Sequence, residues 1–215
     1  MKNYINYLKF DFKIAKKSIK YYVIIQSIIC CSFIFLGNYV FGMSYLFFFL
    51  IILATIPFSM QGNEKSTEMY YMLPAKISSM VLGRFLYLIC TSLVIFILSG
   101  AIILILYGLN KIESLESITI CLNGIISLII CLIQYPICYK FGLEKGKILS
   151  TVIYIVSAMV IFILPRGNQY IYEKLQKNLY LSNNIVLILF SLLMVTFIGY
   201  ISYLISCRIC KKKEV

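Results

Sequence analysis

Two short motifs in this 215-residue sequence have residue types and spacings that could do chemistry. Cys207 and Cys210 have the C-x-x-C spacing of a metal-binding pair, but a zinc site needs four ligands, and the chain has no second such pair and no histidine. We therefore expect no metal site. The alternatives for this pair are reversible lipidation near a membrane edge and an inert end of a membrane span.

The second motif, Gly142-Leu-Glu-Lys-Gly-Lys-Ile148, resembles a phosphate-binding loop. It lacks one spacer residue, and Ile148 stands where a hydroxyl residue would hold magnesium. We interpret it as a tight basic turn, and we expect this chain to bind no cofactor. Catalytic residues are not expected either. The apolar segments described next contain no histidine, carboxylate or lysine, so metalloprotease, aspartyl and serine–lysine chemistry all lack their groups. We do not expect an enzyme.

The composition is that of a membrane protein. The chain is 61% hydrophobic and only 13% charged, whereas soluble domains are roughly half apolar and about a quarter charged. Six apolar runs without Asp, Glu, Lys or Arg are close to the length of about 20 residues that a spanning helix needs. They lie at 21–39, 44–60, 85–107, 118–139, 148–164 and 185–207. We predict an all-α, polytopic membrane protein with six spans in residues 21–215. The chain is long enough for one compact bundle and too short for a bundle plus a second large domain.

The basic residues predict the orientation. The net charge is +12, and all but four of the 20 lysines and arginines fall before the first run, in the second-to-third and fourth-to-fifth connections, or in the tail. The four others are Lys111, Arg166, Lys174 and Lys177. The positive-inside rule places both termini in the cytoplasm of a cell membrane. This distribution is typical of membrane insertion, so we do not expect nucleic acid as a partner.

Residues 1–20 are predicted to form an amphipathic helix. Ile5, Leu8, Phe12, Ala15 and Ile19 share one sector of a helical wheel, beside a sector of lysines. Such a helix lies in the cytoplasmic interface, with its lysines towards anionic headgroups. The alternative is a basic leader that only sets topology.

The connection at 61–84 combines acidic and aromatic residues. Asn63 can cap a short helix, which must stop before Pro74, and Pro74 can start a second helix that runs into the third span. Glu64 and Glu68 are four residues apart and would share one helix face. Exposed methionine and tyrosine at 69–72 suit a partner-docking surface, and the alternative is an interfacial hairpin.

The sequence from Tyr71-Met-Leu73-Pro74 through Lys76 to Gly83-Arg84-Phe85-Leu86 resembles a motif of small bacterial permeases of the type-two ATP-binding-cassette exporter superfamily. The resemblance extends along the whole chain. The chain is also similar in size to the permease of the phenol-soluble-modulin peptide exporter. One departure is that family loops often carry a stronger acidic and aromatic cluster before Leu-Pro.

The resemblance implies a mechanism. The 61–84 loop would be a coupling helix docked in a separate cytoplasmic ATP-binding-cassette ATPase, which binds ATP and magnesium. The working unit would contain two permeases, either two copies of this chain or this chain with a sister permease. The implied ATPase-coupling residues are Glu64, Glu68, Tyr71, Leu73, Pro74, Lys76 and Arg84.

Polar residues in the spans are candidates for a translocation path, although each could equally bond to a neighbouring helix. They are Gln26, Asn38, Thr55, Ser59 and Gln134. Without charge in the spans, an apolar or amphipathic cargo such as a membrane-active or antimicrobial peptide is favoured over small ions. In the external loop at 165–184, Ile171, Tyr172, Leu175 and Leu179 share a helical face, which predicts a short external helix. The alternative function is that of a non-transporting scaffold, sensor or immunity protein.

Overall fold

The computed structural model describes residues 3–60, 76–178 and 184–213, and these residues are helical apart from short connections. Side chains are described for most of them, the longest exceptions being 142–151, 160–178 and 184–190. The helices are α1 (Asn3–Phe35), α2 (Tyr39–Met60), α4 (Ile77–Gly108), α5 (Ser114–Asn178) and α6 (Asn184–Lys213). The prediction of an all-α protein is confirmed for the described residues.

Five helical stretches among the described residues are long and apolar enough to cross a membrane, which confirms a polytopic membrane protein. They are Ser18–Phe35, Tyr39–Phe58, Ile77–Gly108, Glu116–Phe141 and Ser191–Lys212. Each overlaps one of the predicted runs. The remaining predicted run, 148–164, lies within α5, where many side chains fall outside the description. The count of six spans therefore stays a prediction.

A glycine ends α1 and turns the chain into α2. Gly37 has a φ of +77°, a left-handed conformation in which an L side chain is strained. The backbone amides of Gly37 and Asn38 donate to the carbonyls of Ile34 and Phe33 at 3.1 and 3.0 Å. Because the connection is only three residues long, the spanning part of α1 and α2 are antiparallel neighbours.

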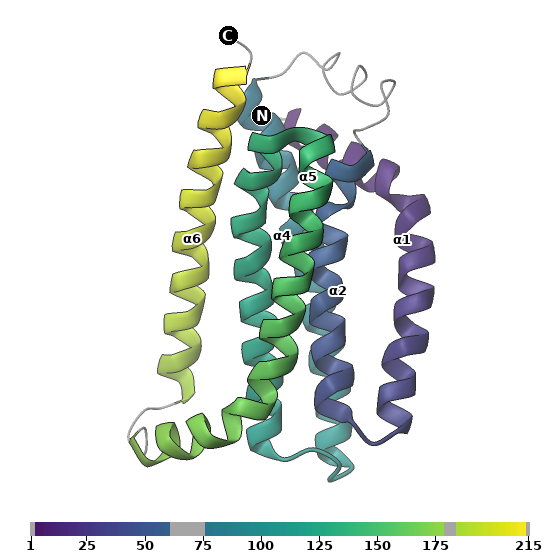
Figure 1. Cartoon of the computed structure of the whole chain (residues 1–215), viewed down its shortest axis with the longest axis vertical. Coiled ribbons are helices and arrows are strands. Elements are labelled where there is room, and N and C mark those ends of the chain that lie inside the picture. The colour runs from purple at the N-terminus through teal and green to yellow at the C-terminus, as the bar shows by residue number, and fades with distance from the viewer. Residues whose placement is uncertain (1–2, 61–75, 179–183, 214–215) are drawn as a thin grey trace.

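Helix α5 folds back on itself. The Phe58 and Tyr135 ring centroids are 5.1 Å apart, and the Thr55 and Tyr154 hydroxyls share a hydrogen bond. Tyr135 and Tyr154 would lie about 28 Å apart along a straight helix, yet their partners are three residues apart on α2. The chain must therefore reverse between Tyr139 and Tyr154, and Figure 1 shows α5 turning over there and descending as a second leg. Its last part runs sideways at the opposite end.

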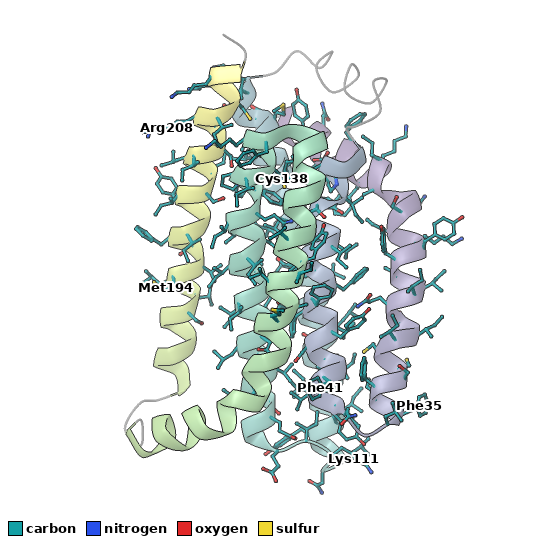
Figure 2. All side chains as sticks on the ribbon, viewed as in Figure 1. Phe35, Phe41, Lys111, Cys138, Met194 and Arg208 are labelled. Carbon is teal, nitrogen blue, oxygen red and sulfur yellow. The ribbon has the colours of Figure 1, made fainter. Side chains whose placement is uncertain are left out.

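The helices form a bundle around α2, whose neighbours are α1, α4 and both legs of α5 (Figure 1). The start of α1, the end of α2, the start of α4 and the end of α6 all lie at one end of the bundle, called here the terminal end. Figure 2 shows Cys138 and Arg208 towards this end, and Phe35, Phe41 and Lys111 at the opposite end. The most buried apolar side chains include Met43, Phe47, Leu50, Ile51, Ala54, Tyr87, Leu88, Ile120 and Tyr135.

The first part of α1, residues 3–17, lies across the terminal end before the helix turns down beside α2 (Figure 1). We call it the N-terminal arm. Lys9, Lys13 and Lys16 on the arm are exposed, whereas Tyr7 and Ala15 are buried against the bundle. The arm is therefore helical, with an exposed face that carries lysines and another face that is buried against the bundle.

Candidate functional site

The segment predicted to couple the chain to an ATPase lies between two helix ends at the terminal end. Helix α2 ends at Met60 and α4 begins at Ile77. Most of the predicted coupling residues fall outside the described residues: Glu64, Glu68, Tyr71, Leu73 and Pro74. The structure describes the two remaining members of that set, which differ in their environments.

Lys76 is exposed and stands immediately before α4. Its backbone is extended, with φ −61° and ψ 140°, and its carbonyl accepts the amides of Ser79 and Met80 at 2.8 and 3.3 Å. Its own side chain does not cap the helix. Helix α4 thus begins three residues after Pro74, at Ile77, instead of at Pro74 itself as the sequence suggested.

Arg84, two turns into α4, is buried, with only 2% of its surface exposed. Its guanidinium carbon lies 4.3 Å from the centre of the Phe58 ring and 5.4 Å from that of Tyr139. Its Nε atom is 4.0 Å from Oδ2 of Asp11 on the N-terminal arm. A guanidinium is attracted to aromatic faces and to carboxylates, and both are present here. We call Asp11, Phe58, Arg84 and Tyr139 the arginine cluster.

Aromatic rings extend the arginine cluster into the bundle. Phe58 meets Tyr135 and Tyr139 edge-on, with ring centroids 5.1 Å apart in both pairs. Phe85 meets Tyr135 at 5.1 Å and Tyr203 of α6 at 5.8 Å, also edge-on. Edge-to-face aromatic pairs add specific geometry to apolar burial. The start of α4 is thereby tied to α2, α5 and α6 at one level of the bundle.

The N-terminal arm packs against the same turns of α4. A Cβ atom built at Gly83 would stand 2.7 Å from the Cβ of Tyr7 and 3.1 Å from the backbone oxygen of Tyr4. Only glycine lets the two backbones approach this closely. One turn further along α4, the Phe12 and Tyr87 rings pack 4.8 Å apart. The arm therefore touches α4 on both sides of Arg84.

Asp11 is the functional candidate that sequence reasoning missed. It is the sole aspartate of the chain and is 1% exposed. Burial raises the pKa of its carboxyl group to about 6, although the nearby Arg84 guanidinium lowers that pKa. Two signals were available in the sequence: an acid stands alone in a strongly basic segment, and it shares a helical face with Tyr7 and Ala15, away from the lysines.

The predicted translocation residues are scattered among the helix contacts. Gln26 is 5% exposed and donates from Nε2 to the carbonyl of Tyr45 at 3.2 Å, which joins α1 to α2. Thr55 is buried and shares its hydroxyl between Tyr154 and the carbonyl of Ile52. Asn38 lies exposed in the α1–α2 connection. These three positions are not brought together in one place.

The other two residues predicted for the translocation path are Ser59 and Gln134, and the structure describes the side chain of Gln134 alone. The side chain of Ser59 falls outside the described ones. Gln134 is 1% exposed, and within the described part of the chain its amide has no hydrogen-bond partner. Sequence reasoning also passed over Asn123, which is fully buried and donates from Nδ2 to the hydroxyl of Ser44 at 2.9 Å. That hydrogen bond joins α2 to the first leg of α5.

The arrangement at the terminal end suits the transmission of motion better than bond-making chemistry. A buried cation on α4 contacts a carboxylate on the N-terminal arm and rings on α2 and α5. A rigid-body shift of the start of α4 would therefore change contacts with three other elements at once.

Comparison with known proteins covers nearly the whole chain. The model of one protein family, described as "ABC-2 family transporter protein", matches residues 7–211. No curated protein and no solved structure was found to match the chain. The match takes in the N-terminal arm from Tyr7, the segment between α2 and α4, and all of α6 but its last two residues.

Proposed function

Because the chain belongs to the ABC-2 family of transporter proteins, we propose that it exports an amphipathic or hydrophobic substrate, in particular a membrane-active or antimicrobial peptide. Membership of the family makes the chain a multi-pass membrane permease of an ATP-binding-cassette exporter, whose partners are a cytoplasmic ATPase and the lipid bilayer. The ATPase supplies the energy, and this chain supplies the helices that move.

The family match over 7–211 is the observation that carries this proposal, and the arrangement of helix ends supports it. The end of α2 and the start of α4 flank residues 61–75 at the terminal end of the bundle (Figure 1). The basic N-terminal arm and the basic end of α6 lie at that same end. We propose that this end faces the cytoplasm and that the coupling residues at 64–76 dock there on the ATPase, which binds ATP and magnesium.

The charges of the bundle support an apolar cargo. Among the residues whose burial is described, the buried charged side chains are Asp11 and Arg84, and both lie at the terminal end. Farther into the bundle, the buried polar side chains are amides and hydroxyls, which provide hydrogen bonds without the fixed charge that an ion-coupled carrier uses. Gln26, Thr55 and Gln134 are proposed contacts for polar groups of such a cargo.

Copurification tests the proposal. The tagged chain, expressed with any ATP-binding-cassette ATPase that neighbouring genes encode, is reconstituted in lipid nanodiscs, and ATP hydrolysis is measured with and without a synthetic amphipathic helical peptide. We expect a bound ATPase whose activity the peptide stimulates. Glu68→Ala and Pro74→Ala should lose the ATPase or its stimulation, whereas Glu113→Ala, exposed at the opposite end, should not. A chain that purifies alone would favour a scaffold, sensor or immunity role.

A further inference from the structure

The strongest feature left unexplained by the family is the buried pair of Asp11 and Arg84. These side chains are 1% and 2% exposed, and they come from elements far apart in the sequence. Burying a charge is unfavourable unless a partner compensates it. The charge of each buried side chain is therefore compensated by the opposite charge of the other.

The pair is close without being a tight hydrogen bond. The Nε–Oδ2 distance is 4.0 Å, and no described residue donates a hydrogen bond to Oδ2 of Asp11. The guanidinium is also held over the rings of Phe58 and Tyr139. Because this distance exceeds that of a hydrogen bond, a small shift of the N-terminal arm relative to α4 would shorten or lengthen it.

We propose that Asp11 is a positioning residue of the transport cycle: it holds the Arg84 guanidinium, so that the N-terminal arm and the first turns of α4 move as one body. This inference rests on the proposed function, in which α4 receives motion from the ATPase through the segment that precedes it. The contact of Tyr7 with Gly83, adjacent to Arg84, gives the same two elements a second connection.

At pH 7.5 the carboxyl group of Asp11 is charged and can pair with the Arg84 guanidinium. Because burial raises the pKa of its carboxyl group to about 6, the fold disfavours the charged form that pairs with Arg84. The groups that face Asp11 are Arg84 and Tyr87 of α4, Tyr135 of α5 and, on its own helix, Tyr7. Phe58, the α2 member of the arginine cluster, brings no titratable group. Arg84 is thus the charged group that faces Asp11.

Distance measurements between spin labels test the connection on the permease alone. Labels are placed at Lys16→Cys on the arm and Lys76→Cys before α4, both exposed, in a chain whose eight cysteines are replaced. In nanodiscs at pH 7.5 we expect one narrow distance distribution. It should be broad in Asp11→Asn and stay narrow in Asp11→Glu.

Asn6→Lys is the matched control, because it adds the same single charge at an exposed position of the arm. It should behave as the unchanged chain. Arg84→Gln should broaden the distribution as Asp11→Asn does, and the double variant should be no broader than either single one. A narrow distribution in Asp11→Asn would overturn the inference, even if Arg84→Gln fails to fold.

The same variants in the complex with the ATPase separate the two proposals. We expect Asp11→Asn to retain the bound ATPase and to lose most of the stimulation by peptide, and Asn6→Lys to keep both. Unchanged stimulation in Asp11→Asn would count against a role in the transport cycle. If no ATPase binds the unchanged chain, the proposed function fails, while the label distances still decide whether Asp11 joins the arm to α4.

Discussion

Tyr7 lies against Gly83 at a distance that no side chain at position 83 could tolerate. The Cβ of Tyr7 would be 2.7 Å from a Cβ atom at Gly83, closer than real Cβ contacts. Both the Cβ of Tyr7 and the nearby Tyr4 carbonyl oxygen are parts of the arm that cannot rotate away. The whole arm would have to move to make room.

Replacement of Gly83 by alanine should therefore detach the N-terminal arm. We expect Gly83→Ala to lower the free energy of unfolding by about 1–3 kcal/mol, the usual range for overpacking. Gly100→Ala in the same helix is the control: nothing lies within 4 Å of its added Cβ, and alanine favours helix, so its stability should be unchanged or higher. Thermal unfolding in detergent micelles compares the two, and equal melting would contradict the close packing of the arm.

A second glycine contact lies deep in the bundle. A Cβ at Gly124 would meet the Phe47 ring at 2.7 Å and the Phe96 ring at 2.8 Å, and these rings already pack 5.1 Å apart. We expect Gly124→Ala to destabilise the protein by about 1–3 kcal/mol, because the rings have little free space to enter. Gly199→Ala meets only Leu132 at 3.7 Å, an ordinary contact, and should have little effect in the same unfolding assay.

Asp11 gives the stability a defined pH dependence. Its pKa is raised from 3.8 to about 6 on folding, so the folded state binds the proton more tightly than the unfolded state. The stability that this carboxyl group contributes is present below pH 3.8 and is lost as the pH rises through 6. The chain should thus be about 1 kcal/mol more stable at pH 5 than at pH 7.5 through this group alone. Unfolding of Asp11→Asn at both pH values isolates the effect, which should vanish in that variant.

The hydrogen bond between Asn123 and Ser44 should couple α2 to α5. Nδ2 of Asn123 donates to Ser44 Oγ at 2.9 Å, and Ser44 in turn donates to the Val40 carbonyl at 2.7 Å. Interhelical hydrogen bonds in membranes are worth about 0.6 kcal/mol on average and up to about 1.7. A double-mutant cycle of Ser44→Ala and Asn123→Ala should give a coupling energy in that range. Strict additivity would mean that the bond adds nothing to stability.

The predicted orientation can be measured by labelling from each side of the membrane. Lys76 and Lys111 are both exposed and lie at opposite ends of α4. In a cysteine-free chain, we expect Lys111→Cys to react with an impermeant thiol reagent added to intact cells, and Lys76→Cys to react only after the cells are opened. The reverse pattern would invert the topology and place the proposed coupling segment outside the cell.

The sequence predicted the spans well because hydrophobicity alone identifies a helix that must satisfy its backbone in lipid. The apolar runs without charged residues at 44–60 and 185–207 agree closely with α2 and α6. They did not show that helix begins before the third apolar run, as it does at Ile77 at the start of α4. Pro74 did predict a helix running into that span, although α4 begins at Ile77, three residues later.

The face that the arm buries was harder to predict. The apolar stripe of the sequence includes Ile5 and Phe12, yet both are exposed. Ala15 at the edge of that stripe is buried, together with Tyr7 and Asp11 beside it. A pattern of hydrophobicity assigns an aspartate to the solvent. Only the tertiary structure reveals that Arg84 is close enough to compensate it. The coupling residues at 64–74 remain a prediction from the resemblance to the family.

The central place of α2 affects how the chain must be assembled in the cell. Of the described segments able to cross a membrane, the one in α2 has the largest buried share, 61% of its most apolar window, and α5 makes many of the contacts to it. Side chains such as Phe58 and Thr55 meet residues synthesised some eighty or more positions later. During synthesis α2 therefore enters the bilayer with its future interior facing lipid. Membrane insertion and helix association are separate steps for this protein, and the second must wait for the return of α5.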